Sequence, residues 1–552
     1  MKTRILIAVL AAFGQSAFAQ QPPSSGGLIQ QVPPAPQMQR PLPDVRIEHG
    51  GKPAAPLADG TRIRVNSLAI TGQSAYSAEE LRALTGFVPG TELSLTDLRA
   101  MAAKISNHYN RNGYVVAQAY LPAQDIKAGE VTIAVVEGRY GKVVLRNTSN
   151  LSESLANGLL GGLNTGDTIT IGPLEERLLL LSDIPGVGMR STLVPGANPG
   201  TSDLLVDIVP RRRVNGSIEA DNHGNRYTGE FRVGGTIHLN NLAGRGDVLS
   251  FRGLAAKGLT YGRLSYQAQF GRATVGIAYT ALEYRLGREF ENLGAHGTAQ
   301  IASLYGSYPL IRSRNTNLYA LAGFDAKTFQ DKIDLTSAVT DRKIGVATFG
   351  LAGDHRDRFG GGGFNAYSAS WSVGELDIET PAARAADALT ARSNGSFNRL
   401  NFHAMRLQSL PGPFSLYGSI RGQVASKNLD ISEKMSLGGA YGVRAYPEGE
   451  AYADEGYLLT IEARMLLPKP DRLPGQVHLV GFVDAGSVTL NKNPWLPGDN
   501  TRTLSGGGAG LTWADPGNFI VRAYYAQKIG NERPTSAPDK KGRFWIQAVK
   551  YF

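Results

Sequence analysis

The chain has 552 residues, no cysteine and a formal net charge of +10. This length exceeds one ordinary globular domain, and the lack of cysteine excludes a disulfide framework. A basic balance can indicate nucleic-acid binding, but the lysines and arginines are scattered rather than grouped, which argues against a nucleic-acid partner and favours a charged interior and charged surfaces.

Residues 1–19 contain the three parts of a signal peptide in order. Lys2 and Arg4 supply the positive start, a short apolar stretch follows, and Ala17-Phe18-Ala19 forms a small-x-small cleavage site before Gln20. The apolar stretch is about half the ~20 residues that a spanning helix needs. No later segment is a long apolar run. The sequence therefore predicts an exported protein without a transmembrane helix.

Residues 20–60 are rich in glutamine and proline and are expected to form a short helix and a linker. Residues 28–32 are long enough for one or two helical turns. Prolines 33, 34, 36, 41 and 43 then forbid continuation, because proline lacks a donor and clashes with the preceding turn. The linker is expected to be extended and semi-rigid. A role for the short helix as a plug of a pore is a hypothesis at this point.

Two similar α+β units follow, at 61–138 and 139–210. In the first, strands are predicted at 63–70, 114–121 and 131–137, with two helices between the first two strands. Ser94 and Asp97 have the spacing of a capping box at the start of the second helix. The same order recurs in the second unit, with helices near 151–161 and from Gly172-Pro173 onward. Two tandem copies of about 75 residues indicate a repeated domain.

From residue 211 to 552, helical periodicity gives way to alternating strands separated by glycine-containing turns. An even strand number and alternating short and long connections are typical of a bacterial outer-membrane barrel. The chain ends on the aromatic Phe552, which we expect to act as the barrel-assembly signal on a last strand that pairs with the first. The sixteen predicted strands are 214–222, 228–240, 246–256, 259–271, 273–285, 297–308, 316–328, 342–354, 362–374, 396–408, 413–425, 453–466, 475–487, 504–514, 517–527 and 541–552.

Two motifs in the last third of the chain are specific. The longest predicted connection, about 426–452, contains Val443-Arg444-Ala445-Tyr446 between glycine-rich flanks, and Phe482-x-Asp484 lies on a later strand. With these motifs the chain resembles the TpsB transporters of two-partner secretion, also called the haemolysin-activator family, which share a superfamily with the barrel-assembly factor BamA. The resemblance implies a membrane β-barrel of sixteen antiparallel strands, preceded by two periplasmic POTRA domains of the α+β class.

The resemblance also implies how these residues act. The sixth extracellular loop folds back into the barrel, where Arg444 meets Asp484 in a bidentate pair. Glycine is usual at the position of Ala445, and alanine is disfavoured there if the backbone has a positive φ. An unfolded client adds a strand to an exposed edge in the first POTRA domain. The expected edge strand is Tyr114, Val115, Val116, Ala117, Gln118, Ala119, Tyr120 and Leu121.

The function implied is export of a large TpsA-type exoprotein, an adhesin or a haemolysin, through the barrel of a Gram-negative outer membrane. The expected partners are that exoprotein, outer-membrane lipids, and the barrel-assembly machinery and periplasmic chaperones during biogenesis. No cofactor or metal is expected. An assembly factor that inserts other barrels remains an alternative, and a diffusion porin a weaker one. An enzyme is not expected, because the histidines lack metal-ligand spacing and no nucleophile elbow is present.

Overall fold

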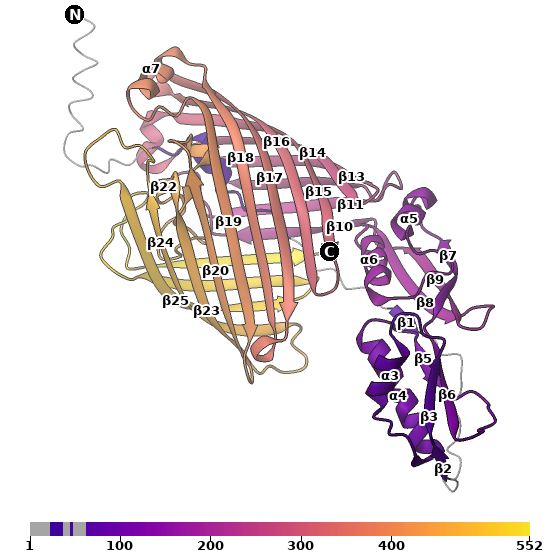
Figure 1. The fold of residues 1–552 in the computed structure, drawn as a ribbon. Coiled ribbons are helices and arrows are strands. Elements are labelled where there is room, and N and C mark those ends of the chain that lie inside the picture. The colour runs from indigo at the N-terminus through magenta and orange to yellow at the C-terminus, as the bar shows by residue number, and fades with distance from the viewer. Residues whose placement is uncertain (1–21, 37–44, 48–61) are drawn as a thin grey trace, which may run out of the picture.

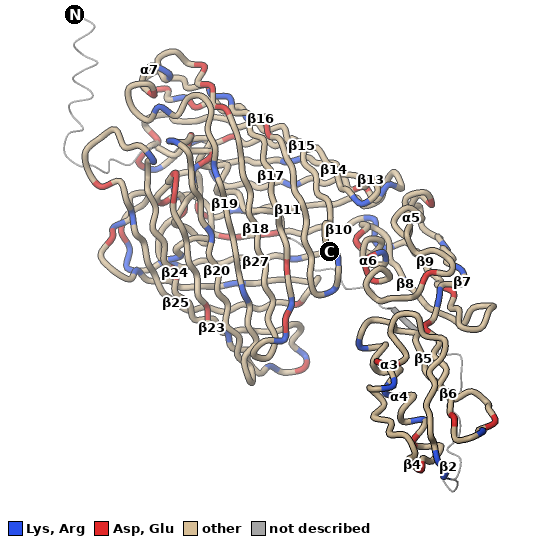
Figure 2. The backbone as a smooth tube through the Cα atoms, in the orientation of Figure 1, with Lys and Arg blue, Asp and Glu red and all other residues tan. Residues whose placement is uncertain are grey.

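The computed structural model describes residues 22–36, 45–47 and 62–552. It contains a closed β-barrel with two small α+β units in a row at one of its ends (Figure 1). Lysine and arginine are interspersed with aspartate and glutamate along the described part of the chain (Figure 2). The predicted signal peptide, 1–19, lies outside the described residues. Among the residues described, no helix is both long and apolar enough to cross a membrane.

The first α+β unit is built around helix α4 (Leu95–Arg111). Ser94 and Asp97 form the predicted capping box, and one face of the helix is buried against the sheet. The predicted strand at 63–70 is two strands that belong to separate sheets, β2-β4 and β3-β6-β5. The other elements of the unit are β2 (Arg62–Val65), β3 (Ser67–Thr71), α3 (Ala78–Thr85), β4 (Thr91–Ser94), β5 (Gln118–Tyr120) and β6 (Glu130–Val136).

Glu137, directly after β6, ties three parts of this unit together. Its buried carboxylate accepts hydrogen bonds from the backbone N–H groups of Ser74 (2.6 Å) and Ala75 (2.7 Å) and from the Tyr109 hydroxyl (2.9 Å). Burial alone would raise the pKa of the Glu137 carboxyl, but these hydrogen bonds hold the pKa below its ordinary value. The carboxylate form is therefore the one that the fold stabilises.

We expect Glu137→Gln to destabilise this unit by about 3 kcal/mol, because it leaves buried donors without an acceptor. Since the folded pKa is depressed, the stabilisation is complete above the ordinary pKa of 4.5 and is lost as the pH falls below it. Hydrogen exchange of α4 and β6 in the full-length protein measures both effects. The exposed Glu92→Gln is the control. Equal protection in the two variants at pH 7 would contradict this role.

The second α+β unit has the helix and strand order predicted for it. Its four-stranded sheet has the order β1-β8-β9-β7. Strand β1 comes from the linker and pairs in parallel with β8, so that Val45 lies opposite Ser191. The sequence did not predict this strand, which covers one edge of the sheet. The elements are β1 (Val45–Ile47), β7 (Arg139–Asn147), α5 (Glu153–Leu160), α6 (Ile171–Ser182), β8 (Val187–Pro195) and β9 (Thr201–Pro210).

The barrel has sixteen antiparallel strands, and the first strand, β10, pairs with the last, β27. Side chains alternate between the lumen and the outer surface, as the burial pattern of β14 shows. The strands are β10 (Val214–Asp221), β11 (Arg232–Asn240), β12 (Val248–Ala256), β13 (Leu259–Phe270), β14 (Ala273–Arg285), β15 (Ala295–Arg312), β16 (Thr316–Ile333), β17 (Ala338–Asp357), β18 (Gly363–Ile378), β19 (Gly395–Ser409), β20 (Phe414–Ala425), β23 (Glu455–Leu466), β24 (Gln476–Thr489), β25 (Thr501–Asp515), β26 (Phe519–Lys528) and β27 (Gly542–Tyr551).

The barrel differs from the prediction mainly in the length of its connections. The long gap predicted at 328–342 is wrong, because β16 continues to Ile333 and β17 begins at Ala338. Phe329 is buried inside the barrel, so the inward apolar alternation continues past the predicted end of the strand. The gap at 374–396 holds helix α7 (Pro381–Leu389), which has proline in its first turn. The connection after β20 is the longest, as predicted, and is called the sixth loop (426–454) below.

Candidate functional site: the barrel lumen

The sixth loop folds back into the barrel rather than extending away from it. It contains a 3₁₀ turn, η4 (Ile431–Glu433), and two short paired strands, β21 (Met435–Ser436) and β22 (Tyr452–Ala453). Val443, Ala445 and Tyr446 near its tip are almost completely buried in a cluster with Phe482 and other wall residues. The loop therefore packs on the inner wall as a structured element.

Arg444 at the loop tip forms the predicted pair with Asp484 on β24. Its Nε lies 2.8 Å from Asp484 Oδ2 and its Nη2 lies 2.8 Å from Oδ1. The backbone N–H of Arg444 also donates to Asp484, and Nη1 donates to Glu462 on β23 at 2.8 Å. Arg444 is 5% exposed and Asp484 is fully buried. A bidentate, buried pair of this kind fixes the orientation of the loop tip as well as its position.

Aromatic side chains complete the site on the barrel wall that binds Arg444. The guanidinium carbon lies 3.5 Å from the centre of the Phe482 ring, a close cation–π contact. Trp545 on β27 donates its indole N–H to the Arg444 carbonyl at 2.7 Å. Because Trp545 belongs to the last strand, the loop tip is attached both to β24 and to the strand that closes the barrel. All the predicted motif residues are thus brought together.

Ala445 occupies the position where the family usually has glycine. Its backbone is not in the left-handed region, so alanine causes no strain there. The methyl group instead lies against Gly506 on β25, where a side chain would collide with Ala445. A glycine on the wall therefore provides the space that the loop alanine needs.

Helix α2 (Ser25–Gln30) lies inside the barrel next to the sixth loop. Leu28 is fully buried in the lumen cluster, and the backbone N–H of Ser25 donates to Asp331 on β16 at 2.8 Å. On the loop side, the Tyr452 hydroxyl donates to the Gly27 carbonyl at 2.9 Å. A side chain at Gly26 would lie 3.0 Å from Ser432, so glycine permits the close approach.

The sequence prediction for this helix was displaced. It centred on 28–32, whereas the helix occupies Ser25–Gln30. Glycine is unfavourable inside a helix, so the Gly26-Gly27 pair argued against a helix at this position. The Gly26-Gly27 pair could nevertheless have indicated the helix position, because glycine in a helix often lies where another backbone packs closely against it.

The chain after α2 continues along the inner wall of the first strands. Arg232 on β11 donates to the Gln31 carbonyl at 3.0 Å, and Arg252 on β12 donates to the Pro33 carbonyl at 2.7 Å. Each arginine is itself held by a buried carboxylate of β10, Asp221 for Arg232 and Glu219 for Arg252. The contacts of these four residues were not predicted from the sequence.

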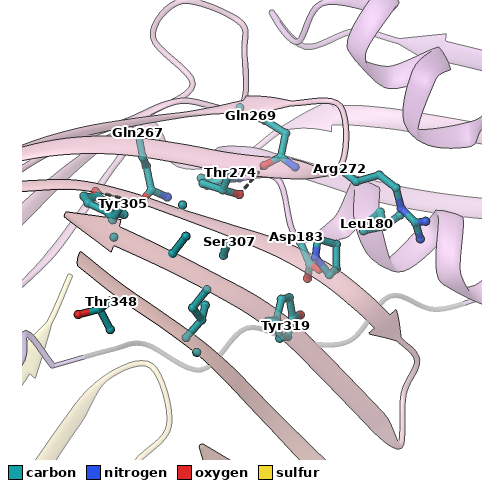
Figure 3. Close-up of a pocket in the computed structure, with 18 of the residues that line it drawn as sticks. Leu180, Asp183, Gln267, Gln269, Arg272, Thr274, Tyr305, Ser307, Tyr319 and Thr348 are labelled. Atoms are coloured by element: carbon teal, nitrogen blue, oxygen red, sulfur yellow. Dashed lines mark hydrogen bonds between the residues drawn. The ribbon is translucent and has the colours of Figure 1, made fainter. Parts of the chain in front are cut away.

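A cavity of about 530 Å³ lies at the mouth of the lumen that faces the second α+β unit. Figure 3 shows uncharged polar side chains and Arg272 of the β13–β14 turn on the barrel side of this cavity, and Leu180 and Asp183 on the other. Asp183 binds Arg312 of β15 through two hydrogen bonds, of 2.7 and 2.8 Å. The labelled uncharged polar residues are Gln267, Gln269, Thr274, Tyr305, Ser307, Tyr319 and Thr348.

Comparison with known families agrees with this architecture. Residues 200–513 match the model of the haemolysin secretion/activation protein ShlB/FhaC/HecB family, and residues 63–138 match the ShlB-type POTRA domain. The chain belongs to the ShlB/FhaC/HecB family. It is therefore an outer-membrane transporter of two-partner secretion, with POTRA domains in the periplasm and a secreted exoprotein as the partner on which the family acts.

Individual relatives are similar over most of the chain. The heme/hemopexin transporter protein HuxB of Haemophilus influenzae is 31% identical over 502 residues, which cover 89% of this chain and 86% of the relative. The outer membrane transporter CdiB of Dickeya dadantii is 24% identical, covering 88% and 83%. The solved structure of CdiB from Escherichia coli has a TM-score of 0.68 at 20% identity, covering 91% of this chain and 92% of that structure.

The expected client-binding strand of the first POTRA domain is shorter than predicted. Only Gln118–Tyr120 forms a strand, β5, and residues 114–117 form a turn. Val115 and Val116 in this turn pack against the core of the second POTRA domain. The backbone N–H of Ala119 donates to the Ser106 hydroxyl of α4 at 2.8 Å. The prediction of an eight-residue edge strand is therefore wrong, because residues 114–117 form a turn in which two of the four side chains contact the neighbouring domain.

Phe552 pairs with the first strand of the transporter barrel, as predicted for the end of the chain. Its backbone N–H and carbonyl both bond to Gly216 of β10 at 3.1 Å. The Phe552 ring lies against Gly216, where a side chain would collide with it, and is 44% exposed. An exposed aromatic ring at this end suits the membrane interface. Its role as an assembly signal stays a prediction.

Proposed function

We propose that this transporter exports an unfolded, large exoprotein through its barrel lumen, after the POTRA domains have bound the client in the periplasm. The main support for the proposal is that two elements of the chain occupy the lumen. Helix α2 and the sixth loop both lie inside a closed wall, and both reach it through connections long enough to let them leave. In this proposal the described state is the resting state, and export requires one or both elements to move.

The contacts of α2 suit an element that is removable. The six-residue helix is held by the burial of Leu28 and by hydrogen bonds such as those from Ser25 to Asp331. Burial of one leucine contributes about 2 kcal/mol, and each hydrogen bond contributes a net ~1 kcal/mol. A client segment that makes similar contacts with the lumen wall can compensate for the loss of this binding free energy and displace the helix.

Client binding is proposed to use the sheet edges of the POTRA domains, since an extended chain can pair with an edge through its backbone. In the first domain the exposed side chains of Gln118 and Tyr120 flank the short edge strand β5. In the second, the linker strand β1 already occupies the edge of β8. This pairing supports the idea that β8 accepts an added strand, which a client could provide in place of β1.

The client is proposed to be a TpsA-type exoprotein, with its folding outside the cell as the driving force. A relative named as a heme/hemopexin transporter and relatives named CdiB supply the analogy. The assembly-factor alternative has a structural parallel, because BamA from Haemophilus ducreyi lacking POTRA domains 1–3 has a TM-score of 0.54 at 16% identity, covering 89% of this chain and all of that structure. At this identity the likeness concerns the fold alone.

Co-expression with the large exoprotein encoded nearest to this gene, in a Gram-negative host that lacks both, tests the proposal. We expect the exoprotein in the medium only when the transporter is present. Retention of the exoprotein in the periplasm, despite heat-modifiable, inserted transporter, would contradict export. A fall in other outer-membrane proteins after depletion of the transporter in its own cell would support the assembly-factor alternative instead.

A further inference from the structure

The lumen wall carries cations whose partners belong to the sixth loop. Lys327 on β16 lies 2.6 Å from Glu433 of the loop, and Arg399 on β19 lies 2.9 Å from the same carboxylate. Arg502 on β25 lies 2.6 Å from Glu450 of the loop. Both loop carboxylates are fully buried. Cations from three separate strands are thus neutralised by carboxylates of a single loop.

The wall itself does not supply equivalent carboxylates. In the described chain, Lys327 and Arg399 form ion pairs only with Glu433. Arg342 on β17 shares its charge between Asp331 of the wall and Asp430 of the loop, each at 2.5 Å. By contrast, the inward carboxylates of β10 and Glu462 of β23 have arginine partners on the wall, and only Asp484 of β24 depends on Arg444 of the loop. The loop carries five carboxylates and three cations. Removal of the loop would therefore leave the wall with an excess of positive charge.

A further wall cation has no ion-pair partner even with the loop in place. Arg421 on β20 faces the lumen, and within the described residues no carboxylate lies at ion-pair distance from it. The barrel wall around the periplasmic cavity carries mostly uncharged polar side chains, and its cation Arg272 pairs with Glu176 of the second POTRA domain. The lumen is thus neutral where a chain would enter and positive deeper inside, once the sixth loop is absent.

We propose that the sixth loop occupies the place of an acidic client segment, and that Lys327, Arg342, Arg399 and Arg502 bind aspartate and glutamate side chains of the client during export. This inference rests on the proposed function and names the chemistry of its substrate: an unfolded polypeptide segment rich in carboxylates. A buried cation is costly without a partner. When an acidic client segment enters, its carboxylates take the place of the loop carboxylates as partners of the wall cations. A basic segment would instead be repelled by these cations.

Full-length transporter in a planar bilayer tests the proposal with two defined probes, poly-glutamate and poly-lysine of about 20 residues, added on the POTRA side. We expect open events to favour chloride over potassium in a salt gradient. We expect poly-glutamate to block the current at least about tenfold more often than poly-lysine, because opposite charges attract over the Debye length of ~10 Å or less at moderate salt.

The decisive variant is Lys327→Gln/Arg399→Gln/Glu433→Gln, which removes Glu433 together with both of its cations and leaves no partner of these ion pairs unpaired. It should lose most of the preference for poly-glutamate. The control Lys343→Gln/Glu379→Gln removes an exposed ion pair at the fifth loop and should behave as the wild type. Equal block by both probes, no block by either, or an unchanged preference in the triple variant would overturn the proposal. Export of the exoprotein by a transporter without this preference would leave the proposed function intact.

Discussion

We expect Arg444→Ala to abolish export of the partner exoprotein without preventing insertion of the barrel. The substitution leaves the buried carboxylate of Asp484 without its cation, leaves Glu462 with Arg464 alone, and removes the contact with Phe482. Loss of one partner from a buried ion pair costs about 3–5 kcal/mol. A penalty of this size should shift the loop tip out of the orientation that the bidentate pair fixes. Exoprotein in the medium, with immunodetection of folded transporter in the membrane, is the measurement.

Two companion variants separate the ion pair from general destabilisation. Arg444→Lys keeps the charge but cannot form the bidentate pair, so partial export is expected. Lys343→Ala removes an exposed pair and should export normally, because surface ion pairs contribute only ~0–1 kcal/mol. Normal export by Arg444→Ala would show that the seated loop tip is not needed for the activity.

The second large effect is expected from Leu28→Asp, which should release α2 and raise the single-channel conductance several-fold. Leu28 is fully buried among apolar side chains of the lumen, where an unpaired carboxylate is strongly unfavourable. The other contacts of the helix are hydrogen bonds, such as those of Ser25 and Gly27, which contribute a net ~1 kcal/mol each. Deletion of residues 22–32 should give the same conductance as the substitution.

Leu389→Asp on the exposed helix α7 is the matched control, since Leu389 is 81% exposed and an added charge there meets water. Its conductance should equal that of the wild type. If Leu28→Asp and the deletion both leave the conductance unchanged, the helix does not obstruct the pore in the resting state, and the sixth loop alone closes it.

The barrel was predictable because each membrane strand repeats a two-residue alternation over many residues, which defines strand number even where the ends are blurred. The pair of Arg444 and Asp484 was also predictable, since two motifs far apart in the chain pointed to the same contact. The wall partners of α2 were not predictable. Arg232 and Arg252 bind backbone carbonyls of the segment after α2. Every residue has a backbone carbonyl, so the sequence of that segment does not indicate which residue accepts the bond.

Short elements were the main failures, for a physical reason. Strand β1 has three residues in a proline-rich segment, and its formation depends on the edge of β8 rather than on local preference. The opposite error occurred at Tyr114–Leu121. Its apolar alternation suited a strand, but Val115 and Val116 are apolar because they contact the neighbouring domain. Tertiary contacts decide such segments.

The attachment of β1 also limits how far α2 can travel. About fourteen residues separate the two elements, and an extended chain spans at most ~3.5 Å per residue, or ~50 Å in total. A helix released from the lumen therefore stays within this radius while β1 remains paired with β8. Its local concentration near the pore is then on the order of millimolar. Reclosure after each export event is an intramolecular reaction, independent of the amount of transporter in the membrane.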